Sequence, residues 1–341
     1  MSRAELRHSR LYVVGGRQRA ARSLSDTDPV WQGYDRGLVL ELDNRTGEVS
    51  SRFEYVSPED VIGGEEAAIC LQSSTIEGDL LFTCTETEVM VYSLPTFERL
   101  HYVSLPIFND LHHVAPTAHG TILVANAGLE MVLEITRTGD VLNAWSALFD
   151  DPWERIDRDV DYRKVSTKPH RAHPNFVFQI GDEIWATRFE QGDAVSLTAP
   201  ERKIDVSDKR IHDGVVHGSR VYFTTVDGKI VVADIERLDV VDVIDLADFH
   251  SERAVLGWCR GILIDGDHLW VGFSRIRPTR FRENVSWVAH GFRHGKPTRV
   301  VCYDLANREC VAEIDLEPGG LSALYSILPA DGGEGGAATS S

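Results

Sequence analysis

Polar side chains of the kinds that bind metal ions or transfer protons recur at the start of several predicted strands. They are carboxylates, amides and imidazoles, found at Glu65-Glu66, Asn109-Asp110, His112-His113, His173-Pro174-Asn175, His212-Asp213-Gly214 and, with a guanidinium, Cys259-Arg260. Burying such oxygen and nitrogen atoms together is costly unless a cation or a substrate satisfies them. If the fold brings these strand entrances to one place, we expect a divalent cation there.

The strands that would carry these residues follow a repeating order. The clearest copy runs from His212 to Leu246, with apolar strands joined by turns at His217-Gly218-Ser219 and Asp227-Gly228. Four strands in about 40 residues, with a hairpin signal between them, is the spacing of a propeller blade. Further copies begin near Glu65, Asn109, Pro174 and Cys259.

The two ends of the chain supply the strands of a sixth blade. The run LSALYSILP at 321–329 has the pattern of a lone first strand, whereas LYVVGG, GLVLELD and EVSSRFEY near the N-terminus match second, third and fourth strands. Their pairing would close the ring and leave no open edge. The sequence therefore predicts an all-β, six-bladed β-propeller as one domain over 1–330, with a disordered Gly/Ala/Ser-rich tail at 331–341. Two sandwich domains are the alternative.

Three long insertions interrupt the repeat, at 15–37, 145–173 and 274–297. All three fall in connections that open onto the face where the first strands begin, and long loops on one rim of a rigid scaffold usually build a ligand site or a partner surface. Arginines in these insertions, Arg275 among them, could recognise an anionic group of a small substrate. Alternatively, they pair with neighbouring acidic side chains and fix the loops.

Composition limits the partners and the compartment. With 53 acidic against 35 basic residues, the formal net charge is −18, which disfavours nucleic acid and anionic membranes as partners. The N-terminal segment has no apolar run typical of a signal peptide or a membrane span, and the five cysteines show no CxxC spacing, so we expect a cytoplasmic protein with reduced thiols. Nucleotide-binding, zincin and α/β-hydrolase motifs are missing from the sequence, so no nucleotide cofactor is expected. The oligomeric state is left open.

The order GEE, FND, PN and DG, each opening a predicted inner strand, resembles the regucalcin/gluconolactonase family of six-bladed propellers. In that family a glutamate, an asparagine and an aspartate hold a divalent cation, a second asparagine contacts the substrate or metal, and lactone hydrolysis is the typical activity. The resemblance implies Glu65 or Glu66, Asn175 and Asp213 as metal ligands. It also implies Asp213 as a general base and Asn109 as a substrate contact.

Histidines beside these motifs depart from the family's pattern. His112 is a further candidate ligand, and His173 and His212, each just ahead of a family-like ligand position, could ligate a metal or take a proton. Oxygen donors alone suit Ca²⁺, Mg²⁺ or Mn²⁺, whereas imidazoles suit Zn²⁺ or Fe²⁺. A histidine-rich throat is also similar to those of streptogramin lyases and aryl sulfotransferases.

Together these patterns favour a divalent-metal-dependent enzyme acting on a small anionic or hydroxylated molecule. Lactone or ester hydrolysis, with a metal-polarised carbonyl and an Asp or His base, is the first expectation. A lyase, an isomerase, an oxygenase and a non-catalytic ligand- or protein-binding propeller are the alternatives. The catalytic candidates are Asp213, His212 and His173. The expected metal ligands are Glu65, Glu66, Asn175, Asp213 and His112. The expected substrate contacts are Asn109, His113, Arg188, Arg260 and Arg275.

Overall fold

A computed structural model describes residues 6–19, 33–64, 67–206, 210–250, 255–275 and 296–331. In these residues strands dominate, and the helices are short 3₁₀ turns such as η4 (Ala127–Leu129) and η5 (Tyr162–Lys164). None of the described helices has the length and apolar character needed to cross a membrane.

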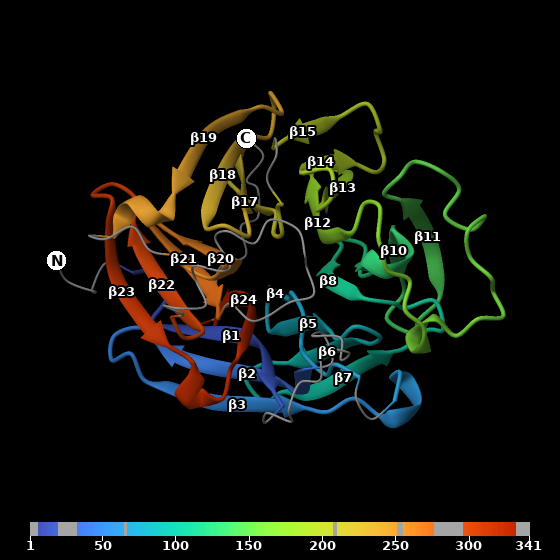
Figure 1. Ribbon diagram of the computed structural model, residues 1–341, viewed down its shortest axis with the longest axis horizontal. Coiled ribbons are helices and arrows are strands. Elements are labelled where there is room, and N and C mark those ends of the chain that lie inside the picture. The colour runs from blue at the N-terminus through green and yellow to red at the C-terminus, as the bar shows by residue number, and fades with distance from the viewer. Residues whose placement is uncertain are drawn as a thin grey trace.

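The described strands form six four-stranded antiparallel sheets arranged around a central axis (Figure 1). Two sheets comprise β24 (Ala323–Pro329), β1 (Arg10–Gln18), β2 (Tyr34–Asp43) and β3 (Val49–Tyr55), and β4 (Thr75–Glu77), β5 (Leu80–Cys84), β6 (Val89–Ser93) and β7 (Glu98–Val103). The next two comprise β8 (Leu111–Pro116), β9 (Ile122–Asn126), β10 (Met131–Ile135) and β11 (Val141–Ser146), and β12 (Pro174–Ile180), β13 (Glu183–Arg188), β14 (Asp193–Ser196) and β15 (Lys203–Asp205). The last two comprise β16 (Val215–His217), β17 (Arg220–Thr224), β18 (Lys229–Asp234) and β19 (Val240–Asp245), and β20 (Trp258–Asp265), β21 (His268–Ser274), β22 (Arg299–Asp304) and β23 (Glu309–Asp315). The predicted six-bladed β-propeller is confirmed.

The ring closes by pairing the last described strand with the first. β24 lies antiparallel to β1, with Val13 opposite Ile327, and β2 and β3 complete that blade. Just beyond β24, the Asp331 carboxylate accepts hydrogen bonds from the backbone N–H groups of Ser9 (2.7 Å) and Arg10 (3.0 Å). The closure expected from the complementary ends is therefore present, because β24 supplies the innermost strand of the blade that contains β1, β2 and β3.

Glycine turns give the blades their common shape. The turn between the first and second strands has glycine in the left-handed region in four blades, at Gly78, Gly181, Gly218 and Gly266 (φ 58° to 63°). Tight hairpins favour glycine at these positions because turns with positive φ have a backbone twist that matches the twist of the flanking strands. These turn glycines are therefore a second feature, besides the strands, that recurs from blade to blade.

Another pair of glycines lies inside a strand, where the sequence suggests a loop. β1 continues through Gly15 and Gly16 to Gln18, and β2 begins at Tyr34, so the strands reach further into the 15–37 segment than expected. A Cβ on Gly15 would lie 1.9 Å from the Ala323 carbonyl oxygen. These glycines allow β1 to approach β24 closely.

The first strands of all blades surround the axis, and apolar clusters fill the spaces between neighbouring blades. One cluster joins Phe82 and Val91 to Val114 and Val124 across two blades. The loop 147–173 precedes β12 and is fully described. Most of the loop expected at 274–297 and of the tail, at 276–295 and 332–341, lies outside the described residues, as does 20–32.

Candidate metal centre at the axis

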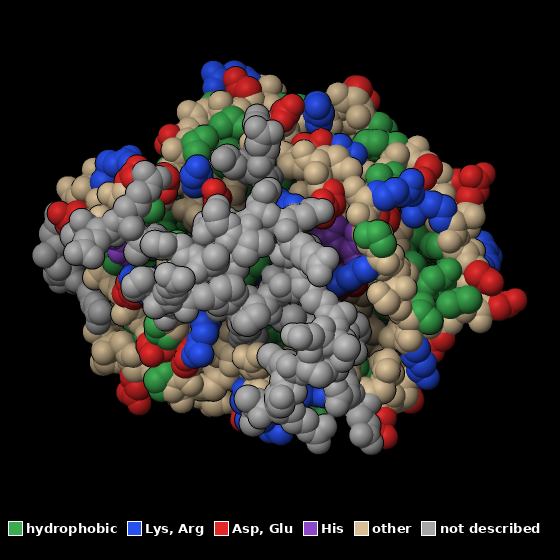
Figure 2. All heavy atoms as spheres, in the orientation of Figure 1, with side chains coloured by type: hydrophobic (Ala, Val, Ile, Leu, Met, Phe, Trp, Pro, Cys, Tyr) green, Lys and Arg blue, Asp and Glu red, His purple; other side chains and the backbone are tan. Residues whose placement is uncertain are grey.

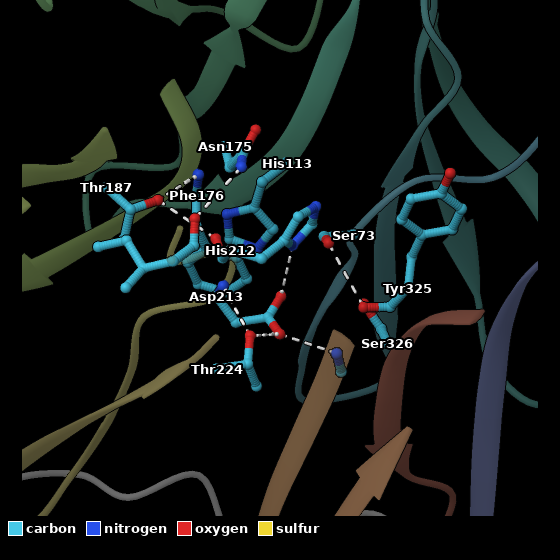
Figure 3. Close-up of polar contacts among 12 residues, drawn as sticks. Ser73, His113, Asn175, Phe176, Thr187, His212, Asp213, Thr224, Tyr325 and Ser326 are labelled. Carbon is cyan, nitrogen blue, oxygen red and sulfur yellow. Dashed lines mark hydrogen bonds and ion pairs between the residues drawn. The ribbon is translucent and has the colours of Figure 1, made fainter. Parts of the chain in front are cut away.

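The entrances of the first strands converge at the mouth of the axis. On this face, histidine side chains are visible in a hollow beside basic and acidic side chains (Figure 2). Deeper in, His113, Asn175, His212, Asp213 and Tyr325 come from four different blades and lie close together (Figure 3). The ring thus brings together residues that are far apart in the sequence.

Asp110, His112 and His173 form a group that could hold a metal ion. One donor atom from each lies within 4.8 Å of the others. His112 Nε2 is 3.6 Å from Asp110 Oδ1, and the rings of His112 and His173 meet edge to face at 4.7 Å between centroids. Asp110 (φ 50°) and His173 (φ 52°) both adopt the left-handed region, which is uncommon outside glycine and often marks functional sites.

The charge of Asp110 is maintained by its neighbours. Lys168 Nζ lies 3.4 Å from Asp110 Oδ2. Burial alone would raise the pKa of Asp110, but the Lys168 ammonium and the His112 imidazole outweigh it and hold this pKa well below its ordinary value. Burial lowers the pKa of His173, and the neighbouring His112 adds to the effect. At neutral pH the group therefore offers a carboxylate and an uncharged imidazole, the forms that bind metals.

Glu130 fixes the loop that carries His173. It follows η4 in the left-handed region (φ 60°). Its carboxylate accepts hydrogen bonds from the backbone N–H groups of Arg171, Ala172 (2.6 Å) and His173 (3.2 Å). In the same loop His170 Nδ1 lies 2.5 Å from His173 Nδ1, so one imidazole donates to the other. This network orients His173 toward Asp110 and His112.

His212 and Asp213 (Figure 3) form a second polar group, and the ring contact of His212 with His112 places it beside the first. His212 Nδ1 lies 3.1 Å from Asp213 Oδ1, while Asp213 Oδ2 accepts from Thr224 Oγ1 (2.6 Å) and from the Gly261 N–H (2.8 Å). Burial is the largest cause that lowers the pKa of His212, to about 4, and the positive charge of Arg260 also contributes. The ring of His212 is 5.8 Å from that of His112. A neutral, oriented imidazole therefore stands next to the candidate metal group.

Burial by itself would raise the pKa of Asp213. Hydrogen bonds from His212, Thr224 and Gly261 outweigh burial, and this pKa lies below its ordinary value. Asp213 is therefore an anion whose two oxygens both accept hydrogen bonds from the protein. That arrangement suits a residue that orients His212.

Buried nitrogen and oxygen atoms that lack a hydrogen-bond partner indicate whether a metal fits this site. Among the described residues, His112 Nδ1, His212 Nε2 and Asn175 Oδ1 are buried and make no hydrogen bond. Such atoms are costly to bury unless a ligand or a metal satisfies them. Their chemistry, with the Asp110 carboxylate, suits a divalent transition metal.

The structure groups only part of the ligand set expected from the sequence. His112 belongs to the metal group, and His173, expected as a catalytic residue, joins it as a candidate ligand. Asn175 is buried nearby, with its amide nitrogen donating to the Ile211 carbonyl (3.4 Å) and its oxygen unpartnered. Glu65 and Glu66 lie outside the described residues.

Asn109 and His113, expected to contact substrate, are engaged by the protein. The Asn109 amide donates to the carbonyls of Tyr162 and Val165 (2.8 Å for Val165), so it holds the loop before β12. His113 Nδ1 accepts from the Val177 N–H (3.2 Å) and Nε2 lies 3.1 Å from Thr75 Oγ1. Burial lowers the pKa of His113 to about 3. Both side chains therefore position the walls of the site.

Two of the three arginines expected to contact substrate are paired with acids. Arg188 binds both carboxylate oxygens of Asp193 (2.7 and 2.6 Å). Arg275 pairs with Glu317 at the exposed rim. Arg260 differs, with its guanidinium carbon 4.9 Å from the centre of the Tyr325 ring.

A pocket of about 220 Å³ opens beside Asp110. The loops at 62–63 and 163–168 line it, together with Glu86 and Asn109. Because Asp110 belongs to both the pocket and the metal group, a small molecule in the pocket would lie beside one of the three candidate ligands.

Several residues of the site were not among those expected. Asp110 stood beside Asn109 in the sequence, and His170 stood close to His173, but neither was assigned a role. Glu130 and Lys168 gave no signal, because their roles depend on how the loop 147–173 folds back over β8. The signal for Asp110 was its place in the Asn109-Asp110 pair, one of the polar strand entrances where a cation was expected.

A second group that could hold a metal consists of His250, Cys310 and Glu313 at the outer edge of the last blade. Its carboxylate is already paired with Lys296 (3.0 Å) and Arg299 (3.0 Å). His250 Nε2 also lies 3.1 Å from the Tyr303 hydroxyl. These contacts satisfy the group without an ion.

Fold and site together define the chain as a six-bladed β-propeller with an axial mouth that could hold a metal ion. No protein-family model and no curated protein matches the sequence. Among solved structures, a protein of unknown function from Bacteroides caccae is similar, with a TM-score of 0.61, 12% identity and coverage of 94% of this chain and 98% of that chain. Virginiamycin B lyase from Staphylococcus aureus is similar at a TM-score of 0.44 and 15% identity, over 69% of this chain and 73% of that chain. At these identities the likeness concerns the fold.

Proposed function

We propose that the protein is a divalent-metal-dependent hydrolase that cleaves a lactone or ester bond in a small anionic or hydroxylated molecule. The observation that carries the proposal is the convergence of Asp110, His112 and His173, with donor atoms within 4.8 Å of one another. The adjoining pocket gives a small molecule access to that group.

The donor set favours a transition metal over calcium. Two imidazoles and one carboxylate match the protein ligands of catalytic zinc sites, whereas Ca²⁺ and Mg²⁺ prefer oxygen ligands. An ion bound there would supply Lewis-acid polarisation of the substrate carbonyl and a bound water of lowered pKa. Asp110, His112 and His173 would hold it, and Glu130 and Lys168 would position two of these ligands.

His212 is the residue best placed to accept a proton. Asp213 holds its Nδ1, which leaves the buried Nε2 as the free acceptor. The depressed pKa of about 4 keeps this imidazole uncharged at neutral pH. Asp213, which the family resemblance suggests as the base, would then act by orienting His212.

Metal analysis of the purified, untagged protein tests the ligand set. We expect one zinc per chain in the wild type, and a metal content reduced about tenfold or more in Asp110→Asn and His112→Asn, because each removes a ligand. His119→Asn on an exposed turn of the same blade is the control. Metal content unchanged in both ligand variants would contradict the proposal.

Activity is tested separately on a panel of lactones and aryl esters. We expect His212→Asn to keep the metal and lose about 100-fold or more in kcat, the usual effect of removing a general base. Iron in place of zinc would favour the second candidate, an oxygenase, since two histidines and one carboxylate also form the iron site of many oxygenases. Metal uptake with no effect of His212→Asn would remove His212 from the mechanism.

A further inference from the structure

Arg260 carries a positive charge at the axis without an acidic partner among the described residues. It lies on β20 and its guanidinium packs over the ring of Tyr325, at 4.9 Å from the ring centre. Its Nε is buried and makes no hydrogen bond within the described part of the chain. The residue as a whole is only partly buried, so an anion at the axial mouth could reach the guanidinium and pair with it.

Other arginines around the mouth show what the chain does when a guanidinium serves structure. Arg188 pairs with Asp193, Arg163 binds both oxygens of Asp161 (2.8 Å each), and Arg275 pairs with Glu317. In a chain with 53 acidic residues, a guanidinium at the axis that has no acidic partner in the described ranges stands apart from these.

The backbone next to Arg260 is fixed to the candidate catalytic group. Gly261 (φ 72°) forms an irregularity in β20, and its N–H donates to Asp213 Oδ2 (2.8 Å). The same carboxylate holds His212, whose ring lies 6.3 Å from that of Tyr325. Arg260 is thus held at a fixed place beside His212 by the strand and by Tyr325.

We infer that Arg260 is the binding site for a carboxylate of the substrate, so that the molecule acted on carries a carboxylate in addition to the bond that is cleaved. Guanidinium groups match planar carboxylates with paired hydrogen bonds, and stacking on an aromatic ring orients them for this. That the bound carboxylate belongs to a substrate rests on the proposed hydrolase function, but carboxylate binding by Arg260 itself requires no metal.

The test uses the full chain stripped of metal, with ¹³C-labelled acetate as the probe and NMR titration as the readout. We expect saturable binding to the wild type, weakened about tenfold or more in Arg260→Gln, because hydrogen bonds to a charged group are lost. Arg260→Lys keeps the charge but not the planar fork, and we expect it to bind with intermediate affinity. Arg237→Gln, on the exposed turn before β19, makes the same charge change away from the axis and should bind like the wild type.

Thermal unfolding of each variant establishes that it is folded. Equal acetate affinity in the wild type and Arg260→Gln would overturn the inference, as would the lack of saturable binding to the wild type. These results are independent of metal content. If the protein binds zinc but not acetate, the proposed function stands and the inference about Arg260 is wrong. If it binds acetate through Arg260 but takes up no metal, the inference stands and the proposed function is wrong.

Discussion

Substitution of Glu130 by glutamine tests how the metal group is positioned. The carboxylate accepts three backbone N–H groups, those of residues 171–173. Glutamine keeps one acceptor oxygen, which can still serve Ala172 and His173, but its NH₂ group then faces the N–H of Arg171. One charge-assisted bond is lost and the other two become neutral ones. With bonds to charged groups contributing about 1.5–3 kcal/mol each and neutral bonds about 1 kcal/mol each, the loss in the free energy of unfolding is about 2.5–7 kcal/mol.

The same change should weaken metal binding, because the loop that presents His173 is no longer fixed. Residues that orient metal ligands typically affect affinity by about 10–100-fold, and we expect that range for Zn²⁺ measured by competition with a chelator. Urea unfolding of the metal-free protein measures the stability. Glu134→Gln is the matched control, since Glu134 lies on the same blade and accepts from Thr121 Oγ1 (2.6 Å) and Asn143 Nδ2 (2.7 Å) away from the site.

An affinity for Zn²⁺ equal to that of Glu134→Gln would refute this reasoning, even if Glu130→Gln were less stable. Glu130 would then support the loop without orienting the ligand. If Glu130→Gln had the stability and the Zn²⁺ affinity of the wild type, Glu130 would neither support the loop nor orient His173.

Two further predictions concern pH and packing. Burial, with the nearby Asp110 carboxylate, raises the pKa of Glu86 from 4.5 to about 8. Between these two pH values the folded state keeps a proton on Glu86 that the unfolded state releases. The free energy of unfolding of the metal-free protein should therefore fall as the pH rises through this interval. Urea titrations at several pH values should show a smaller fall in Glu86→Gln, and an identical pH profile in that variant would disprove the assignment. Gly261→Ala should destabilise the fold by about 1–2 kcal/mol more than Gly47→Ala does. Both glycines have positive φ (72° and 75°), but of the two only Gly261 would bring its new Cβ against a neighbour, Leu324 Cδ2 at 2.7 Å. Equal thermal stability of these two variants would show that the contact is relieved without cost.

The architecture was predictable because strand and turn patterns are local. Apolar runs separated by Asp-Gly and His-Gly turns identify the blades, and the complementary ends identify the ring closure, as in the pairing of Val13 with Ile327. Within the described residues, the pattern failed where glycine serves close packing. Gly15 and Gly16 suggest a loop in the sequence, but they lie inside β1 against β24.

The site was predictable in its place but less so in its members. Strand entrances had to converge at the axis, which brought His112, His173 and His212 together. The role of Asp110 depends on its left-handed backbone and on Lys168, which a loop brings back from far along the chain. Likewise, the alternative that arginines pair with nearby acids holds for Arg163 and Asp161, but spacing alone does not distinguish that pair from Arg260.

Ring closure also determines when the newly made protein can bind a ligand at the axis. Tyr325, on which Arg260 stacks, belongs to β24, the strand that completes the blade begun by β1. During synthesis the other blades can form while this strand is still being made, yet the axial mouth then lacks one wall. Ligand binding at the axis should therefore report directly on closure, and a ligand that binds there would stabilise the closed ring over any opened form.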